Sequence, residues 1–99
     1  MNISWTTEAK RALRAIEEFI ARDSEFYAAR MVAQIVEQVE RAAAHPTKGH
    51  IVHEYPELSL KEIHASPYRI IYAYSDEDLK VVTIIHFRQV LLKERLSRR

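Results

Sequence analysis

The spacing of apolar residues changes halfway along the chain, and this change limits the fold more than any other feature. Up to residue 44, apolar side chains recur every three or four positions, which is the period of an amphipathic helix. From residue 50 onward they come in short runs rich in β-branched and aromatic residues, which is typical of strands. Between the two halves, Pro46 disfavours helix at His45, and Gly49, the only glycine, permits a turn. We therefore expect an α+β fold in which helices pack on a small, mainly antiparallel sheet.

The first half predicts a short N-terminal strand at residues 2–5, followed by two helices. Thr6 or Thr7 can cap the first helix and Asp23 or Ser24 the second, because a side-chain oxygen there accepts a hydrogen bond from a free amide of the first turn. Both helices carry apolar stripes, which comprise Ala9, Leu13, Ile16 and Ile20 in the first and Ala28, Ile35, Val39 and Ala42 in the second. Two such helices joined by a short turn form an antiparallel hairpin, whose apolar faces need a sheet to cover.

The second half predicts four extended segments. Residues 68–74 and 80–87 are the strongest strands, and the sequence SDED between them supplies the turn of a hairpin. Residues 50–55 alternate as a strand does, and residues 60–66 have the mixed polarity of an edge strand or a one-sided strand.

The C-terminal segment QVLLKERLSRR has a helical pattern and four basic residues among its last seven. Two arrangements stay open for it. Leu92 and Leu96, four positions apart, could dock it on the sheet, or its charges could leave it mobile until a partner arrives.

Composition narrows the class of protein further. A chain of 99 residues that is 47% hydrophobic predicts one domain, and the absence of cysteine removes disulfides and thiolate metal sites. The net charge of +1 is a weak basis for nucleic-acid binding, and no stretch approaches the ~20 apolar residues of a membrane span. The histidines lack metal-ligand spacing, since His50 and His53 would face opposite ways on a strand. We expect a cytoplasmic protein with no membrane contact, metal or cofactor.

Polar side chains gather where the two strongest strands meet, away from their turn. His86 and Arg88 lie two residues apart, so on a strand they would point the same way, and the hairpin brings Arg69 close to both. The exact register is open, because a slip of one residue reverses the facing. Each residue also has a structural interpretation: His86 as a hydrogen-bonded strand end, and Arg69 as the ion-pair partner of Glu54 or Glu62.

The order of these elements resembles the RelE/ParE superfamily of type II toxin–antitoxin toxins. The resemblance rests on P-x-x-G at 46–49, EIHASPYRIIY at 62–72 and IIHFR at 84–88, and it covers essentially the whole chain. It implies an N-terminal strand and a helical hairpin packed on a sheet. It also implies a growth-inhibiting toxin of a plasmid-stabilisation module, neutralised by a ParD- or RelB-like antitoxin that wraps an extended, partly helical segment around it.

Two activities divide this superfamily. ParE-like members bind and poison DNA gyrase, whereas RelE-like members cleave messenger RNA on the ribosome. In a ribonuclease, Arg69 and Arg88 would stabilise the phosphate and His86 would act as acid or base. However, the lysines of well-known RelE ribonucleases fall at Leu60 and Glu62 here, and their C-terminal tyrosine has no counterpart. These departures favour the gyrase poison, with the ribonuclease as an alternative and an inactive interaction module as a third hypothesis.

Overall fold

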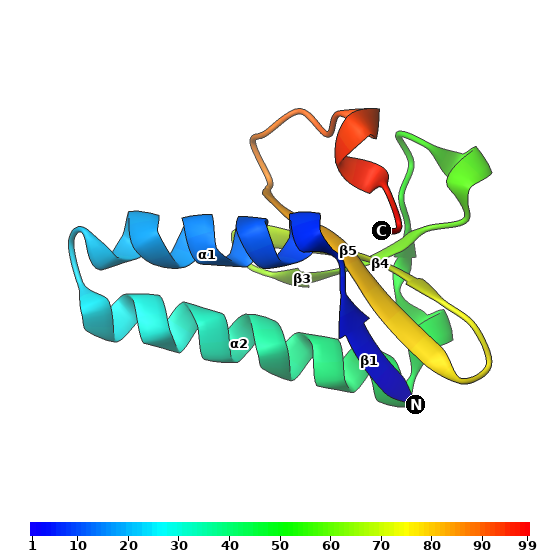
Figure 1. Ribbon diagram of the computed structural model, residues 1–99, viewed down its shortest axis with the longest axis horizontal. Coiled ribbons are helices and arrows are strands. Elements are labelled where there is room, and N and C mark those ends of the chain that lie inside the picture. The colour runs from blue at the N-terminus through cyan, green and yellow to red at the C-terminus, as the bar shows by residue number, and fades with distance from the viewer.

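Two helices pack on one face of a five-stranded sheet in the computed structural model, which describes residues 1–99 (Figure 1). The helices and strands are, in chain order, β1 (Asn2–Trp5), α1 (Thr7–Ala21), α2 (Glu25–Ala44), β2 (His50–Ile51), β3 (Lys61–Ala65), β4 (Tyr68–Tyr74) and β5 (Asp78–His86). Short 3-10 turns cover Pro46–Lys48, Pro56–Leu58 and Lys93–Leu96. The predicted α+β class, with its N-terminal strand and helical hairpin, is confirmed.

The strands lie in the order β1-β5-β4-β3-β2, with β1 parallel to β5 and every other pair antiparallel. The strand predicted at residues 50–55 is mostly absent, because the chain turns after the two residues of β2 and Tyr55 donates its N–H back to the carbonyl of Val52. The segment predicted as an edge or one-sided strand at residues 60–66 is β3, and β2 covers only its first two residues, Lys61 and Glu62, so the rest of β3 forms the edge of the sheet.

Hydroxyl caps fix where both helices begin. The Thr6 hydroxyl oxygen accepts from the N–H of Ala9 at 3.0 Å and donates to the carbonyl of Val82 at 2.6 Å. The Ser24 hydroxyl accepts from the N–H of Tyr27 at 3.2 Å. Thr6 therefore caps α1 and also ties it to β5, while Ser24 caps α2.

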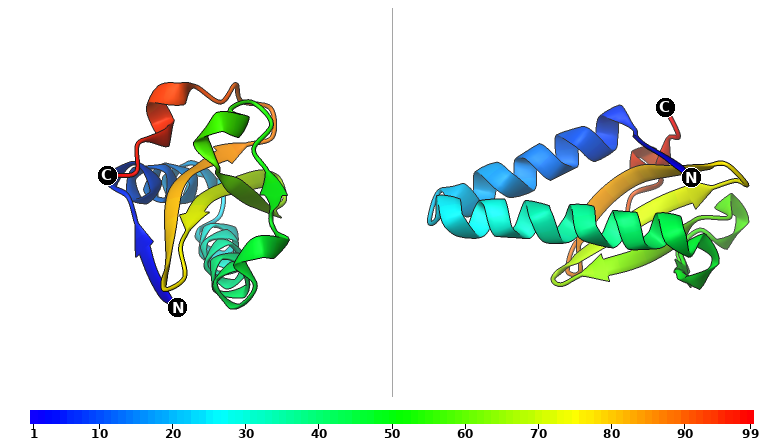
Figure 2. Two further views of the ribbon diagram at one scale, coloured as in Figure 1. Left: turned by 90° about the vertical axis from the view of Figure 1, so that its right-hand side faces the viewer. Right: turned by 90° about the horizontal axis from the view of Figure 1, so that it is seen from below.

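The sheet is buried on both faces, which explains why β4 and β5 read as nearly continuous apolar runs. Between the sheet and the helices lies a cluster that includes Ala9, Ala12, Ile35, Val39, Ala42, Tyr68, Ile70, Tyr72, Leu79, Val81 and Ile84. The outer face holds a second cluster of Val52, Leu60, Ile71, Ala73, Val82, Ile85, Leu91 and Leu96. The C-terminal segment and the residues between β2 and β3 cover this outer face (Figure 2).

The C-terminal segment docks on the sheet, but not as the leucine spacing predicts. Leu91 and Leu96 are buried, whereas Leu92 is 49% exposed. The helical pattern yields only the 3-10 turn Lys93–Leu96, whose last residue packs in the outer cluster. The hydroxyl of Tyr55 donates to the carbonyl of Leu91 at 2.9 Å, which holds the start of the segment in place.

Glu8 connects α1 to the C-terminal segment. Its carboxylate accepts hydrogen bonds from Arg11, Thr83 and Arg95, at 2.7 to 3.0 Å. Burial alone would raise the pKa of Glu8, but the bonds from Arg11, Thr83 and Arg95 lower it to about 2. The carboxylate is therefore charged across the physiological range.

Neither α1 nor α2 has the length and apolar character that crossing a membrane requires.

Candidate functional site

Arg88 lies in a turn beyond the end of β5. β5 ends at His86, and the chain turns through the next three residues. The N–H of His86 donates to the side-chain oxygen of Gln89 at 2.9 Å, and the N–H of Arg88 donates to Nδ1 of His86 at 3.1 Å. These bonds close the strand end as a turn. The prediction that His86 and Arg88 share one face of a strand is therefore wrong.

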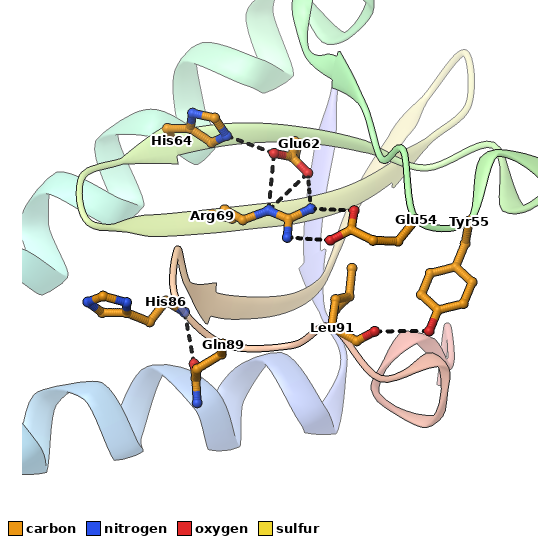
Figure 3. A network of polar contacts seen from close by, with 8 residues as sticks. All are labelled: Glu54, Tyr55, Glu62, His64, Arg69, His86, Gln89 and Leu91. Atoms are coloured by element: carbon orange, nitrogen blue, oxygen red, sulfur yellow. Dashed lines mark hydrogen bonds and ion pairs between the residues drawn. The ribbon is translucent and has the colours of Figure 1, made fainter.

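Arg69 and His86 lie on opposite faces of the sheet. Tyr68 pairs with His86 and Arg69 pairs with Ile85, and directly paired residues of antiparallel strands share a face. Tyr68 belongs to the cluster beneath the helices, and Ile85 belongs to the outer cluster. The two side chains are thus near one end of neighbouring strands but separated by the sheet itself. Figure 3 shows Arg69 turned towards Glu62 and away from His86.

The Arg69 guanidinium is occupied by two carboxylates (Figure 3). Nε donates to both oxygens of Glu62 at 3.1 Å, and Nη2 donates to Glu62 at 2.5 Å. Nη1 and Nη2 donate to Glu54 at 2.7 and 2.9 Å. The hydrogen bonds that Arg69 donates, first to Glu54 and then to Glu62, raise the pKa of Arg69, and the bond from Arg69 lowers the pKa of Glu54. The structural interpretation of Arg69 as an ion-pair partner is confirmed, with both glutamates taking part.

This network leaves Arg69 poorly placed to hold a phosphate. Its side chain is 13% exposed, all three nitrogens are engaged, and a phosphate would meet two carboxylates around one cation. Glu62 is itself buried against Arg69. The network instead links Glu54, which lies between β2 and β3, to Arg69 on the central strand β4.

Two histidines beside this network were not singled out from the sequence. Nε2 of His64 lies 2.8 Å from Glu62, and the His64 ring stacks on His50 with centroids 5.6 Å apart. The Phe87 ring also packs edge-on with His64, with ring centroids 5.1 Å apart. The strand pairing of β2 with β3 brings them together, and this pairing leaves no motif in the sequence.

His86 borders a groove between α1 and the ends of β4 and β5. The groove has a volume of about 390 Å³ and is lined by Arg11, Ala12, Ala15, Ile16, Phe19, Tyr68, Ile84, His86, Gln89 and Arg95. Tyr68 packs edge-on against the His86 ring at 5.5 Å, and burial raises the pKa of the Tyr68 hydroxyl. No carboxylate lines the groove to orient His86 as a general base. Two of the cations that line the groove, Arg11 and Arg95, are paired with Glu8, so they do not converge on a site beside His86.

Comparisons with known proteins agree with the fold. The sequence matches the family described as "ParE toxin of type II toxin-antitoxin system, parDE" over residues 3–91. It is 36% identical over 89 residues to the Sinorhizobium fredii protein named "Putative toxin Y4kP", and the match covers 88% of each chain. A solved structure described as "Chromosomal ParDE TA system from P. aeruginosa" has the same fold, with a TM-score of 0.72 and 21% identity over 87% of this chain and 95% of that one. The resemblance to the RelE/ParE superfamily is thereby confirmed, on its ParE-like side, and the chain belongs to the family of ParE toxins of type II toxin–antitoxin systems.

Proposed function

We propose that this protein inhibits bacterial growth by binding and poisoning DNA gyrase, and that a cognate ParD-like antitoxin neutralises it. The observation that carries the choice of target is the occupied guanidinium of Arg69. A RelE-type ribonuclease needs cations and an acid–base group converging on one phosphate. Here the candidate cation is held by two glutamates, and the candidate acid–base group, His86, lies on the other face of the sheet.

A toxin that acts by binding needs exposed surface instead of a catalytic site. The closed end of the α1–α2 hairpin projects beyond the sheet (Figure 1) and carries three aromatic side chains that are 61% to 64% exposed, Phe19, Phe26 and Tyr27. Phe26 and Tyr27 pack edge-on at 5.3 Å, and Arg22 lies 5.9 Å from the centre of the Phe19 ring. Aromatic and arginine side chains dominate the binding energy of protein interfaces. This hairpin end therefore supports action on a protein target.

Induction of the protein in a bacterial host, without and with the small protein encoded beside it, tests this function. We expect growth arrest with a DNA-damage response, and rescue on co-expression of the neighbouring protein. His86→Ala and Arg88→Ala should still arrest growth, because neither residue performs chemistry in a gyrase poison.

Two other outcomes would identify the alternatives. Messenger RNA cut in phase with codons on ribosomes, and abolished by His86→Ala, would establish the ribonuclease. Normal growth on induction, with accumulation of folded protein, would establish an inactive interaction module.

A further inference from the structure

The closed end of the α1–α2 hairpin lies beyond the apolar clusters that hold the fold together (Figure 2, right). The last residue of α1 that packs on the cluster beneath the helices is Ile16, and the first of α2 is Met31. The three large rings between them, Phe19, Phe26 and Tyr27, belong to neither cluster. The core therefore does not require these rings, and an exposed apolar surface of this kind marks an interaction site.

The backbone of this end is fixed, so its side chains are presented in one arrangement. Only residues 22–24 separate the two helices. The N–H groups of Asp23 and Ser24 both donate to the carbonyl of Ile20, at 3.1 and 3.0 Å, and the Ser24 hydroxyl then caps α2. A surface that is already ordered loses less conformational entropy when it binds a partner.

The aromatic side chains of this end line two different hollows. Phe19 of α1 lines the groove beside His86. Tyr27 of α2 lines a second hollow of about 390 Å³, with Ile20 of α1 and with Arg30, Met31 and Gln34 of α2. No residue lines both hollows. The hairpin end thus offers aromatic surface on two sides, one on each helix.

The charges of this end balance one another. Residues 19–30 contain two arginines, Arg22 and Arg30, and two acidic residues, Asp23 and Glu25. None of the four forms an ion pair within the protein. Nucleic acid is a poor occupant for such a surface, because its binding depends on a clear excess of cations. A protein with apolar recesses suits it better.

We infer that the hairpin end enters a cleft of DNA gyrase with apolar walls, where Phe19 contacts one wall and the Phe26–Tyr27 pair contacts the other. The inference rests on the proposed action on gyrase and adds the surface that performs it. Arginines beside exposed rings, as Arg22 is beside Phe19, are frequent anchors of protein interfaces and would meet carboxylates at the rim of the cleft.

A second copy of this chain is a poorer occupant than gyrase. The three rings are 61% to 64% exposed, so two projecting ends in contact would bury roughly 500–900 Å² through them. A specific, stable interface buries at least ~1,200 Å². A cleft can also enclose both flanks of the hairpin end and so add to the contact.

Binding of alanine variants to purified gyrase tests the inference. Phe19→Ala and Tyr27→Ala should each weaken binding at least ~10-fold, and inhibition of supercoiling with it, because each removes the contact with one wall. Phe87→Ala is the matched control, at a ring that is 45% exposed in the turn after β5, and it should bind as the native protein does. Circular dichroism should show all three variants folded, since each ring is exposed.

The outcomes separate this surface from the proposed function. Native affinity for gyrase in both Phe19→Ala and Tyr27→Ala would overturn the inference and leave the proposed function intact. A loss in only one of them would show contact with a single wall and so contradict the cleft. Failure of the native toxin to bind gyrase would remove both.

Other occupants give results of their own, and each of these would overturn the inference. If the two variants bind gyrase normally but lose affinity for the protein encoded beside the toxin, the antitoxin occupies this end. If the native toxin dimerises in sedimentation and Tyr27→Ala does not, with gyrase affinity unchanged, a second copy occupies it.

The dependence on salt distinguishes apolar contact from contact with DNA. Raising the salt concentration from about 50 to about 200 mM should change the affinity for gyrase less than ~3-fold, because the charges of the hairpin end balance. A loss of ~100-fold or more would mean that phosphate contacts carry the binding.

Discussion

Arg69 joins parts of the chain that are distant in sequence, since its own strand is β4 and its partners are Glu62 on β3 and Glu54 beyond β2. Glu62 is 7% exposed, so its charge depends on these contacts. Burial alone would raise the pKa of Glu62, but hydrogen bonds from Arg69 and then His64 hold it below its usual value. In such a network a single missing partner leaves a buried charge.

Arg69→Met should lower the free energy of unfolding at pH 7 by about 2–4 kcal/mol, because it leaves the buried Glu62 carboxylate without its cationic partner. In the native protein, Glu62 has a lowered pKa, so its contribution is complete above its ordinary pKa and is lost as the pH falls. In Arg69→Met the pKa of Glu62 should lie above its ordinary value, so the difference in stability between the variant and the native protein should shrink as the pH falls through that raised pKa. Urea unfolding at pH 7 and pH 4 measures both effects.

The double variant Arg69→Met/Glu62→Met is the matched control. It should recover much of the lost stability at pH 7, because it removes the unpaired charge as well. Unchanged stability of Arg69→Met at pH 7 would mean that the network does not hold the outer face together.

At the scale of elements, the C-terminal segment completes the core on the outer face of the sheet. Leu91 and Leu96 pack there with Ile71 and Val82 of the central strands. Arg95 donates to Glu8, to the Thr83 hydroxyl and to the carbonyl of Ile84, which links the segment to α1 and β5. Without this cover, the outer face of β4 and β5 would be exposed to water.

Two adjacent leucines test this docking. Leu91→Ala should cost about 2–4 kcal/mol of unfolding free energy, because Leu91 is only 3% exposed. Leu92→Ala, at a side chain that is 49% exposed, should change it by less than ~0.5 kcal/mol. Thermal and urea unfolding of the two variants measure the difference. Similar losses for both would show that the segment does not dock in the observed register.

At the scale of the whole molecule, the sequence predicts the features that depend on neighbouring residues, such as the type of each element and the caps of the helices. The change in apolar period at Pro46 predicts the two layers, and Thr6 and Ser24 are among the expected caps. The sequence could not predict that Arg69 and His86 lie on opposite faces of the sheet. That placement depends on the register of β4 and β5, and a shift of one residue would move each side chain to the other face. The sequence also could not predict that Leu91 is buried and Leu92 exposed, because the docking of the C-terminal segment on the sheet decides it.

The same limits apply to the candidate site. His86 and Arg69 could be identified as polar residues near one end of the strand hairpin, but the partners that occupy Arg69 come from a separate segment. Their convergence depends on long-range packing, which the local sequence pattern does not encode. Arg69 is therefore part of a structural ion-pair network, and the exposed end of the α1–α2 hairpin is the surface that the proposed function would use.

Supercoiling of relaxed plasmid by purified DNA gyrase, with the purified toxin added, tests the proposed function most directly. The toxin should inhibit supercoiling and cause cleaved DNA to accumulate, and the preformed toxin–antitoxin complex, as the control, should do neither. Full gyrase activity in the presence of excess folded toxin, together with messenger RNA cleavage on ribosomes by the same preparation, would contradict it.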